Sequence, residues 1–274
     1  MNGPFVDLDA LAARIPDGAT VVLSPDYSGC AMSAVRRLIA RGVRDLHLVG
    51  APTLTLHGDM LVGAGCVRTV EAAAVTLGEH GMAPRFAAAV SAGSIQLKDS
   101  TCPAIHAALQ AAEKGIPFMP LRGILGTDVL ANRPDWKVMD NPFGTDDPIV
   151  LLPAIRPDVA LMHVPLVDRA GNVWVGVRRE LMLMAHAARE TLVTYEAVYD
   201  DDLLQDDAMA AGTIPALYVT ALAEAKQGAW PLGLFGAYAK DDENLALYAQ
   251  MARTEEGFRA YLDRFLVPNQ AAAE

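Results

Sequence analysis

An arginine and a group of small polar residues follow an apolar run near the middle of the chain. The stretch 115–130 reads GIPFMPLRGILGTDVL, and Arg122 comes directly after its most apolar part. Ligands of open α/β sheets bind at the carboxyl ends of the strands. A guanidinium at the end of a buried strand also needs an anionic partner nearby. We therefore predict that Arg122 pairs with a substrate carboxylate or with Asp99.

The residues after Arg122 suit a loop that approaches a ligand. Gly123 and Gly126 would let the backbone bend close to it, because glycine adopts conformations that other residues avoid. Thr127 and Asp128 would line the pocket or cap the next segment, and for Asp128 the cap or turn role is favoured.

A second polar group lies in IQLKDSTCP at 95–103. Pro103 fits the first turn of a helix, and Asp99, Ser100 or Thr101 would cap that helix by accepting a backbone hydrogen bond. We favour this capping role.

Other sequence motifs are weak. The GAG at 63–65 lacks the third glycine of a dinucleotide fingerprint. No phosphate-loop, GxSxG or HExxH motif occurs, and the six histidines lack metal-ligand spacing. His163 lies inside the apolar run ALMHVP and is predicted to be a hydrogen-bonded core histidine. The sequence therefore predicts neither a metal site nor a serine triad.

The elements that position these residues read as alternating strands and helices. DGATVVL at 17–23, AMSAVRRLIARG at 31–42 and VRDLHLVG at 43–50 form a strand, helix and strand unit, which predicts a parallel pair. Further apolar runs predict strands, with helices at 103–114 and 178–188. These runs lie at 68–75, 115–120, 158–165, 172–176 and 190–198. The expected fold is α/β, an open and mostly parallel sheet flanked by helices.

The chain shows no clear domain boundary, so residues 1–274 are predicted to form one domain. The segment 132–148 is rich in Pro, Asp and Asn and predicts a loop excursion from the sheet. Two amphipathic helices are expected in the C-terminal segment 241–267.

Composition excludes several functions. The chain is 52% hydrophobic and carries a formal net charge of −11, which argues against nucleic acid or an anionic membrane as partner. No stretch is long and apolar enough to cross a bilayer, and the N-terminus carries no export signal, so a cytoplasmic location is expected. The three cysteines are predicted to be reduced thiols in or near the core.

The order of these segments resembles the A subunits of class I CoA-transferases. The resemblance is closest to the glutaconate CoA-transferase type and to the steroid ring-opening CoA hydrolases, and it spans nearly the whole chain. Its carriers include GDMLVGAGCVRTVEAAAVTLGEHG, the 115–130 stretch, RPDVALMHVPLVDRAGNVWVG and GAYAKDDENLALY. The resemblance implies the CoA-transferase fold shared with sugar-phosphate isomerases.

The resemblance also implies the chemistry. In these enzymes an acyl-CoA thioester is attacked by a glutamate of a B-type subunit, so this chain is expected to work only with that partner, in a heterodimer or heterotetramer. Coenzyme A thioester is the implied substrate, and no tightly bound cofactor is expected. Hydrolysis of the thioester, including hydrolytic ring opening, and a non-catalytic CoA-binding role are the alternatives.

The sequence departs from the family at the turn after the first strand. In place of a glycine-rich turn it reads SPDYSG, in which Pro25 lacks an N–H donor and Asp26 adds negative charge. Ser28 and Gly29 remain as candidates for binding substrate or CoA. An ordinary turn entering the next helix explains this segment equally well.

A second departure concerns Asp99, which falls near a catalytic glutamate of the hydrolase-type relatives but is one methylene shorter. Lys98 replaces the neighbouring acid. The resemblance thus makes Asp99 a candidate base, and Arg122 matches an active-site arginine of the same relatives. A base must reach its proton within hydrogen-bond distance, which the shorter side chain makes harder.

Overall fold

A mostly parallel sheet forms the centre of the molecule in the computed structural model, which describes residues 4–266. Seven strands run parallel in the order β12-β10-β8-β1-β2-β3-β4, and the short β9 and β11 add antiparallel pairs beside β8. The predicted open α/β sheet is confirmed. Its strands are β1 (Thr20–Leu23), β2 (Leu46–Gly50), β3 (Val67–Ala72), β4 (Gln96–Asp99), β8 (Val159–Asp168), β9 (Val173–Trp174), β10 (Glu190–Tyr199), β11 (Thr213–Ile214) and β12 (Ala221–Glu224).

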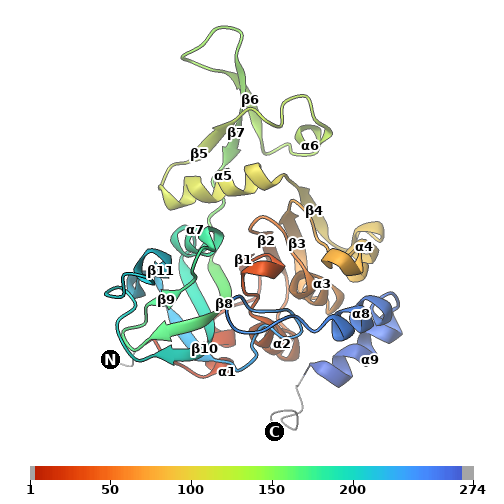
Figure 1. The fold of residues 1–274 in the computed structure, drawn as a ribbon. Helices are drawn as coiled ribbons and strands as arrows, with labels where there is room; N and C mark the ends of the chain where they lie inside the picture. The colour runs from red at the N-terminus through yellow and green to blue at the C-terminus, as the bar shows by residue number, and fades with distance from the viewer. Residues whose placement is uncertain (1–3, 267–274) are drawn as a thin grey trace.

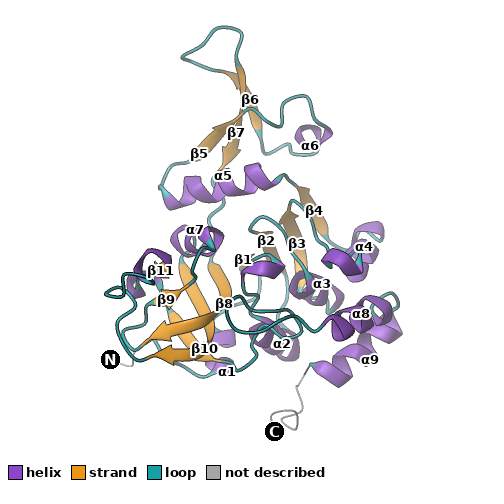
Figure 2. Ribbon diagram, in the orientation of Figure 1, coloured by secondary structure: helices purple, strands orange, loops and turns teal. Residues whose placement is uncertain are grey.

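Helices cover both faces of this sheet, as Figure 2 shows. One face packs against α1, α2 and α3, and the other against α5 and α7, through two separate apolar clusters. The central strands read as continuous apolar runs because both of their faces are buried. The bounds are α1 (Leu8–Ala13), α2 (Met32–Arg41), α3 (Leu56–Gly63), α4 (Pro84–Ser91), α5 (Cys102–Glu113) and α7 (Arg179–Ala187).

The strand order reverses between β1 and β8. From β1 the chain adds β2, β3 and β4 on one side, and it then returns to place β8, β10 and β12 on the other. The loops after β1 and β8 therefore diverge, which leaves a crevice at the carboxyl ends of these two strands. Crevices at such a switch point are the usual ligand sites of open α/β sheets.

A second, three-stranded antiparallel sheet stands away from the central body, beyond α5 (Figure 1). Its order is β5-β7-β6, and the strand β6 forms inside the segment 132–148 that was predicted as a loop. The run 115–120 was predicted as a buried strand, and the burial is wrong: its strand is β5, and Phe118 is 42% exposed. The bounds are β5 (Phe118–Leu121), α6 (Asp128–Ala131), β6 (Lys137–Asp140) and β7 (Pro148–Pro153).

The C-terminal segment 241–267 folds, as far as residue 266, into two helices that pack beside α3. These are α8 (Asp242–Met251) and α9 (Glu255–Phe265), whereas residue 267 lies outside the described residues. The Tyr248 hydroxyl donates a 2.6 Å hydrogen bond to the buried Asp59 carboxylate of α3. Among residues 4–266, no helix has the length and apolarity needed to cross a membrane.

Buried charges join the three-stranded sheet to the central one. Arg133 is 4% exposed, and its guanidinium donates to Glu71 of β3 at 2.7 Å, to Asp135 at 2.9 Å and to the Asp99 carbonyl at 3.0 Å. His47 Nε2 lies 3.1 Å from the other Glu71 oxygen. Burial alone would raise the pKa of Glu71, but His47, Arg133 and Lys98 together lower it. The buried carboxylate therefore stays ionised, and the guanidinium fixes the outer sheet over β3 and β4.

Replacing this guanidinium should destabilise the fold strongly. Arg133→Met leaves Glu71 buried without its main partner, and we expect a loss of about 3 to 5 kcal/mol in the free energy of unfolding at pH 7. Because the folded-state pKa of Glu71 is lowered, its contribution is present above the ordinary pKa of 4.5 and is lost as the pH falls below it. Urea unfolding from pH 7 to pH 3 should therefore show the difference from wild type shrinking.

Arg14→Met is the matched control, because its pair with Glu190 is partly exposed on both sides. It should cost at most about 1 kcal/mol. Equal losses in the two variants would contradict the role assigned to Arg133.

Candidate functional site

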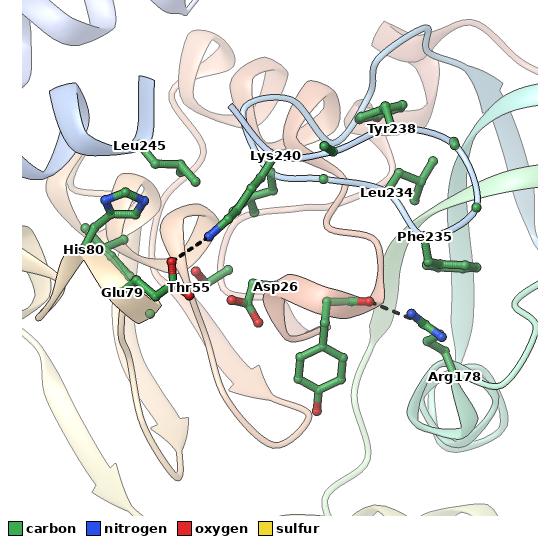
Figure 3. Close-up of a pocket in the computed structure, with 18 residues that line it drawn as sticks. Asp26, Thr55, Glu79, His80, Arg178, Leu234, Phe235, Tyr238, Lys240 and Leu245 are labelled. Carbon is green, nitrogen blue, oxygen red and sulfur yellow. Dashed lines mark hydrogen bonds and ion pairs between the residues drawn. The ribbon is translucent and has the colours of Figure 1, made fainter. Parts of the chain in front are cut away.

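A cleft of about 680 Å³ lies at the carboxyl ends of β1, β2 and β3. Its floor comes from the turn after β1, with Asp26 and Tyr27, and from Thr55 after β2. Residues 77–80 after β3 form one wall, and Arg178 with the loop 232–240 forms the other. Figure 3 shows Lys240 and Glu79 to one side of Asp26 and Arg178 to the other. The cleft thus lies where β1, β2 and β3 end, beside the point at which the strand order reverses.

The turn after β1 is held by a close contact with β8. Residues Asp26–Ser28 form one short 3-10 turn, and Gly29 follows with φ at +83°. The Gly29 carbonyl accepts a 2.8 Å hydrogen bond from the His163 N–H. A Cβ on Gly29 would lie 2.0 Å from the His163 carbonyl oxygen, so both the backbone angle and the available space require glycine.

Ser28 and Gly29 therefore contact the protein interior in this chain. The Ser28 side chain is fully buried and donates its hydroxyl to the Glu180 carboxylate on α7. Neither residue lines the cleft, whereas their neighbours Asp26 and Tyr27 do. The turn thus lies at a ligand-sized cleft. The residues that line the cleft are Asp26 and Tyr27, whereas the sequence suggested Ser28 and Gly29 as binding residues.

A partly buried carboxylate, that of Glu196, holds the other wall. Glu196 accepts hydrogen bonds from His163 Nε2 at 2.9 Å, from the Tyr238 hydroxyl at 2.9 Å and from the N–H groups of Gln227 and Gly228 at 2.9 and 3.0 Å. Burial would raise the pKa of Glu196, but the hydrogen bonds from His163 and the two N–H groups lower it. Glu196 of β10 thereby connects residues 227–228, which precede the cleft wall 232–240, to β8.

His163 is confirmed as a hydrogen-bonded core histidine. Its ring is fully buried, and Nδ1 lies 2.8 Å from the Thr194 hydroxyl while Nε2 contacts Glu196. Both ring nitrogens are occupied by protein partners. The role of Glu196 was not predicted, because a lone glutamate in VTYEAV gives no sign of the segments that it will join.

The rim of the cleft carries two cations. Lys240 lies between Asp242 at 3.0 Å and Glu79 at 3.2 Å, and these two carboxylates raise its pKa. The Arg178 guanidinium lies 4.5 Å from the Phe235 ring centroid and donates to the Tyr27 carbonyl at 3.3 Å. Cations at the mouth of a cleft attract phosphate and carboxylate groups.

The predicted catalytic candidates do not meet within this chain. Asp99 ends β4, and its carboxylate accepts a 2.9 Å bond from the adjacent Ser100 N–H. Thr101 is the residue that caps α5, accepting from the Ala104 N–H at 3.3 Å. Arg122 lies at the far end of β5, 62% exposed, and donates to Asp147 Oδ1 at 2.7 Å. The partner of Arg122 in this chain is thus Asp147 and not Asp99.

The loop after Arg122 also lies away from the large cleft. Gly126 adopts φ at +72°, and Gly123 has open space around it. Thr127 donates its hydroxyl to the Ile124 carbonyl at 2.8 Å, and Asp128 begins the short α6. None of these four residues lines the cleft. The loop therefore takes no part in this cleft.

Two of the three cysteines are buried and one is exposed. Cys30 and Cys66 are buried as predicted, and burial raises the pKa of both thiols. Cys102 is exposed at the first position of α5, so the prediction of a core position was wrong for it. Within residues 4–266, no group of three His, Cys, Asp or Glu side chains could hold a metal ion.

Comparison with known proteins gives consistent matches. The coenzyme A transferase family profile matches residues 6–225. The A subunit of the 3-oxoadipate CoA-transferase of Pseudomonas knackmussii is 29% identical, over 94% of this chain and 91% of the relative. The cholesterol ring-cleaving hydrolase IpdA subunit of Mycobacterium tuberculosis is 28% identical, over 96% and 93%. An uncharacterized protein of Archaeoglobus fulgidus is 31% identical over 94% of this chain, which spans only 58% of that relative.

A solved structure agrees with the sequence matches. The structure of glutaconate coenzyme A-transferase from Acidaminococcus fermentans superposes with a TM-score of 0.88 at 25% identity. The match covers 96% of this chain and 89% of that one. The two chains therefore share their overall fold.

The Glu196 contacts should be needed for an ordered cleft wall. Glu196→Gln places an NH₂ group among N–H and O–H donors, so at least one donor loses its partner. We expect a loss of about 1 to 3 kcal/mol in unfolding free energy. Hydrogen exchange should quicken at the Gln227 and Gly228 amides. Glu224→Gln is the control, because Glu224 is 57% exposed and pairs only with Lys226; unchanged exchange in Glu196→Gln would refute this role.

Proposed function

Because the chain belongs to the coenzyme A transferase family, we propose that it is the A subunit of a heteromeric enzyme that transfers CoA between acyl groups. The observation that carries this proposal is the cleft at the β1–β8 switch point, combined with a match along nearly the whole of a relative named as one subunit of a transferase. A cleft of about 680 Å³ lies in the range of small-molecule sites.

The nucleophile is expected on a B-type partner. In the reaction that the resemblance implies, a glutamate oxygen of the partner bonds to the thioester carbon, the C–S bond breaks, and CoA leaves as the thiolate. The thiolate then attacks the glutamyl carbonyl of the resulting anhydride, which releases the first carboxylate and leaves CoA bound to the enzyme as a thioester. An acceptor carboxylate takes the CoA by the same two steps in reverse.

This chain supplies one side of the cleft in which those steps would take place. The Arg178 guanidinium at its rim favours the phosphates of CoA, whereas Lys240 is already paired with Glu79 and Asp242. The partly buried carboxylate of Glu196 already accepts hydrogen bonds from His163 and Tyr238, and the buried Asp59 accepts one from Tyr248. A partner that closes over the cleft would bring the reactive carboxylate and exclude water from it. We infer that the pair works in the cytoplasm and needs no tightly bound cofactor.

Hydrolysis is the second candidate, favoured by the similarity to a protein named as a ring-cleaving hydrolase subunit. In that reaction Asp99 would act as base and Arg122 would orient a substrate carboxylate. Asp99 and Arg122 have separate partners in this chain, so hydrolysis needs the B-type subunit to bring a ligand to both of them. Transfer is the function that the cleft supports better.

A thioester screen separates the candidates. The chain should be inactive alone, and the pair with its B-type subunit should exchange CoA between glutaryl-CoA or other acyl-CoA thioesters and added carboxylates. Release of free CoA without an acceptor, at a rate that acceptors do not change, would show hydrolysis instead. Acyl-CoA binding without turnover in the pair would show a non-catalytic subunit.

A substitution of Arg122 tests separately whether the three-stranded sheet takes part in turnover. Its pair with Asp147 is exposed, so Arg122→Ala should change the free energy of unfolding by at most about 1 kcal/mol. If the partner closes on this sheet, turnover should fall far more than stability does. Lys137→Ala on the exposed strand β6 is the control and should leave both unchanged. A melting-temperature loss that matches the activity loss would make Arg122 structural.

A further inference from the structure

Two charged side chains of the cleft, those of Asp26 and Arg178, form no salt bridge with any of the described residues 4–266. The other acidic and basic residues that line the cleft, Glu79, His80 and Lys240, are all paired. A charge that the protein leaves without an ionic partner is available to a ligand. The cleft therefore presents one free negative charge and one free positive charge.

The Asp26 carboxylate reaches from the floor of the cleft to the wall formed by residues 77–80. A Cβ added to Gly78 would lie 3.8 Å from Asp26 Oδ2. The Gly78 N–H does not bind this carboxylate, because it donates to the Thr76 hydroxyl at 3.1 Å. Among residues 4–266, no donor forms a hydrogen bond with the Asp26 side chain. Its oxygens are thus left to accept from a ligand.

Negative charge is in excess on this side of the cleft. Lys240 is shared between Glu79 at 3.2 Å and Asp242 at 3.0 Å, and His80 Nε2 lies 3.1 Å from the same Asp242. Figure 3 shows Lys240 and Glu79 on one side of Asp26, with Arg178 on the other side. Three carboxylates therefore lie near one lysine and one histidine, so an anionic group of a ligand is repelled here.

The opposite side of the cleft holds the free positive charge. The Arg178 side chain is partly buried, its guanidinium lies 4.5 Å from the Phe235 ring centroid, and its Nε donates to the Tyr27 carbonyl at 3.3 Å. These contacts fix the position of the guanidinium. They use only one of its five N–H donors, and the others suit the oxygens of a phosphate.

We propose that these two charges orient the bound thioester, with the CoA phosphates at Arg178 and the acyl chain beside Asp26. This inference rests on the proposed function. Asp26 then determines the class of acyl group. A carboxylate on the acyl chain would meet a like charge, whereas a hydroxyl or amino group would donate a hydrogen bond to Asp26. The preferred substrate is therefore a hydroxyacyl- or aminoacyl-CoA and not the thioester of a dicarboxylic acid.

Two thioesters of equal chain length test the class of acyl group. Glutaryl-CoA ends in a carboxylate, and 5-hydroxypentanoyl-CoA ends in a hydroxyl. In the pair with the B-type subunit, with acetate as acceptor, kcat/KM should be at least about 10-fold higher for the hydroxyacyl thioester, because like charges that meet on binding are strongly unfavourable. The difference should shrink as the salt concentration rises.

Asp26→Asn removes the charge and keeps the size of the side chain. Relative to 5-hydroxypentanoyl-CoA, kcat/KM for glutaryl-CoA should rise by at least about 10-fold. The melting temperature should stay at the wild-type value, since Asp26 is exposed and unpaired. Asp200→Asn is the control: it removes the same charge from a side chain that is 92% exposed and does not line the cleft, and it should leave the preference unchanged.

Arg178→Gln tests the orientation of the thioester. Both thioesters carry the same CoA phosphates, so KM should rise by a similar factor for both and the preference between them should stay the same. A changed preference in Arg178→Gln would place the acyl chain at Arg178 and overturn the orientation.

The outcomes separate this inference from the proposed function. An active wild-type pair that prefers glutaryl-CoA, or that does not distinguish the two thioesters, would overturn the inference alone. An unchanged preference in Asp26→Asn would also overturn it, because another group would then make the selection. A wild-type pair that turns over no thioester would overturn the proposed function and this inference together.

Discussion

The close contact between Gly29 and His163 is the constraint on which the functional face of this protein depends. At the β1–β8 switch point the turn after β1 must pass over β8, and only a residue without a side chain fits there. His163 is in turn held by Glu196, which also fixes the loop that forms the far wall of the cleft. One chain of contacts therefore sets both the floor and a wall, although its members lie far apart in the sequence.

A second set of buried contacts decides where the outer sheet lies. Arg133 joins Glu71, Asp135 and the Asp99 carbonyl, so the segment that carries Arg122 is fixed over β3 and β4 and not at the large cleft. A buried guanidinium stabilises the fold only while it contacts its carboxylates. The contacts of Arg133 therefore also fix the orientation of the outer sheet. Asp99 and Arg122 are thereby kept apart within one chain.

The resulting cleft has few free charged groups. Arg178 and Lys240 lie at its rim, while the carboxylates of Glu196 and Asp59 accept hydrogen bonds from the protein itself. Under the proposed function, such a surface would bind and orient a thioester. It is poorly suited to attacking the thioester. The expected need for a second chain agrees with relatives that are named as subunits. It also agrees with a longer relative, of which this chain spans only 58%.

The sequence by itself determined the parallel sheet, most of its strands, the core role of His163 and the family, because these depend on local apolar runs, their order and their spacing. It missed β4, β6, β7, β11 and β12, most of which have two to four residues and become strands only through pairing with neighbours. It also placed Arg122 at the end of a buried strand, since an apolar run does not say which sheet it will join. Only the tertiary structure decided that Asp26 and Tyr27 line the cleft, that Ser28 contacts Glu180, and that Glu196 joins three segments. These facts depend on contacts between residues distant in sequence, and no local pattern encodes them.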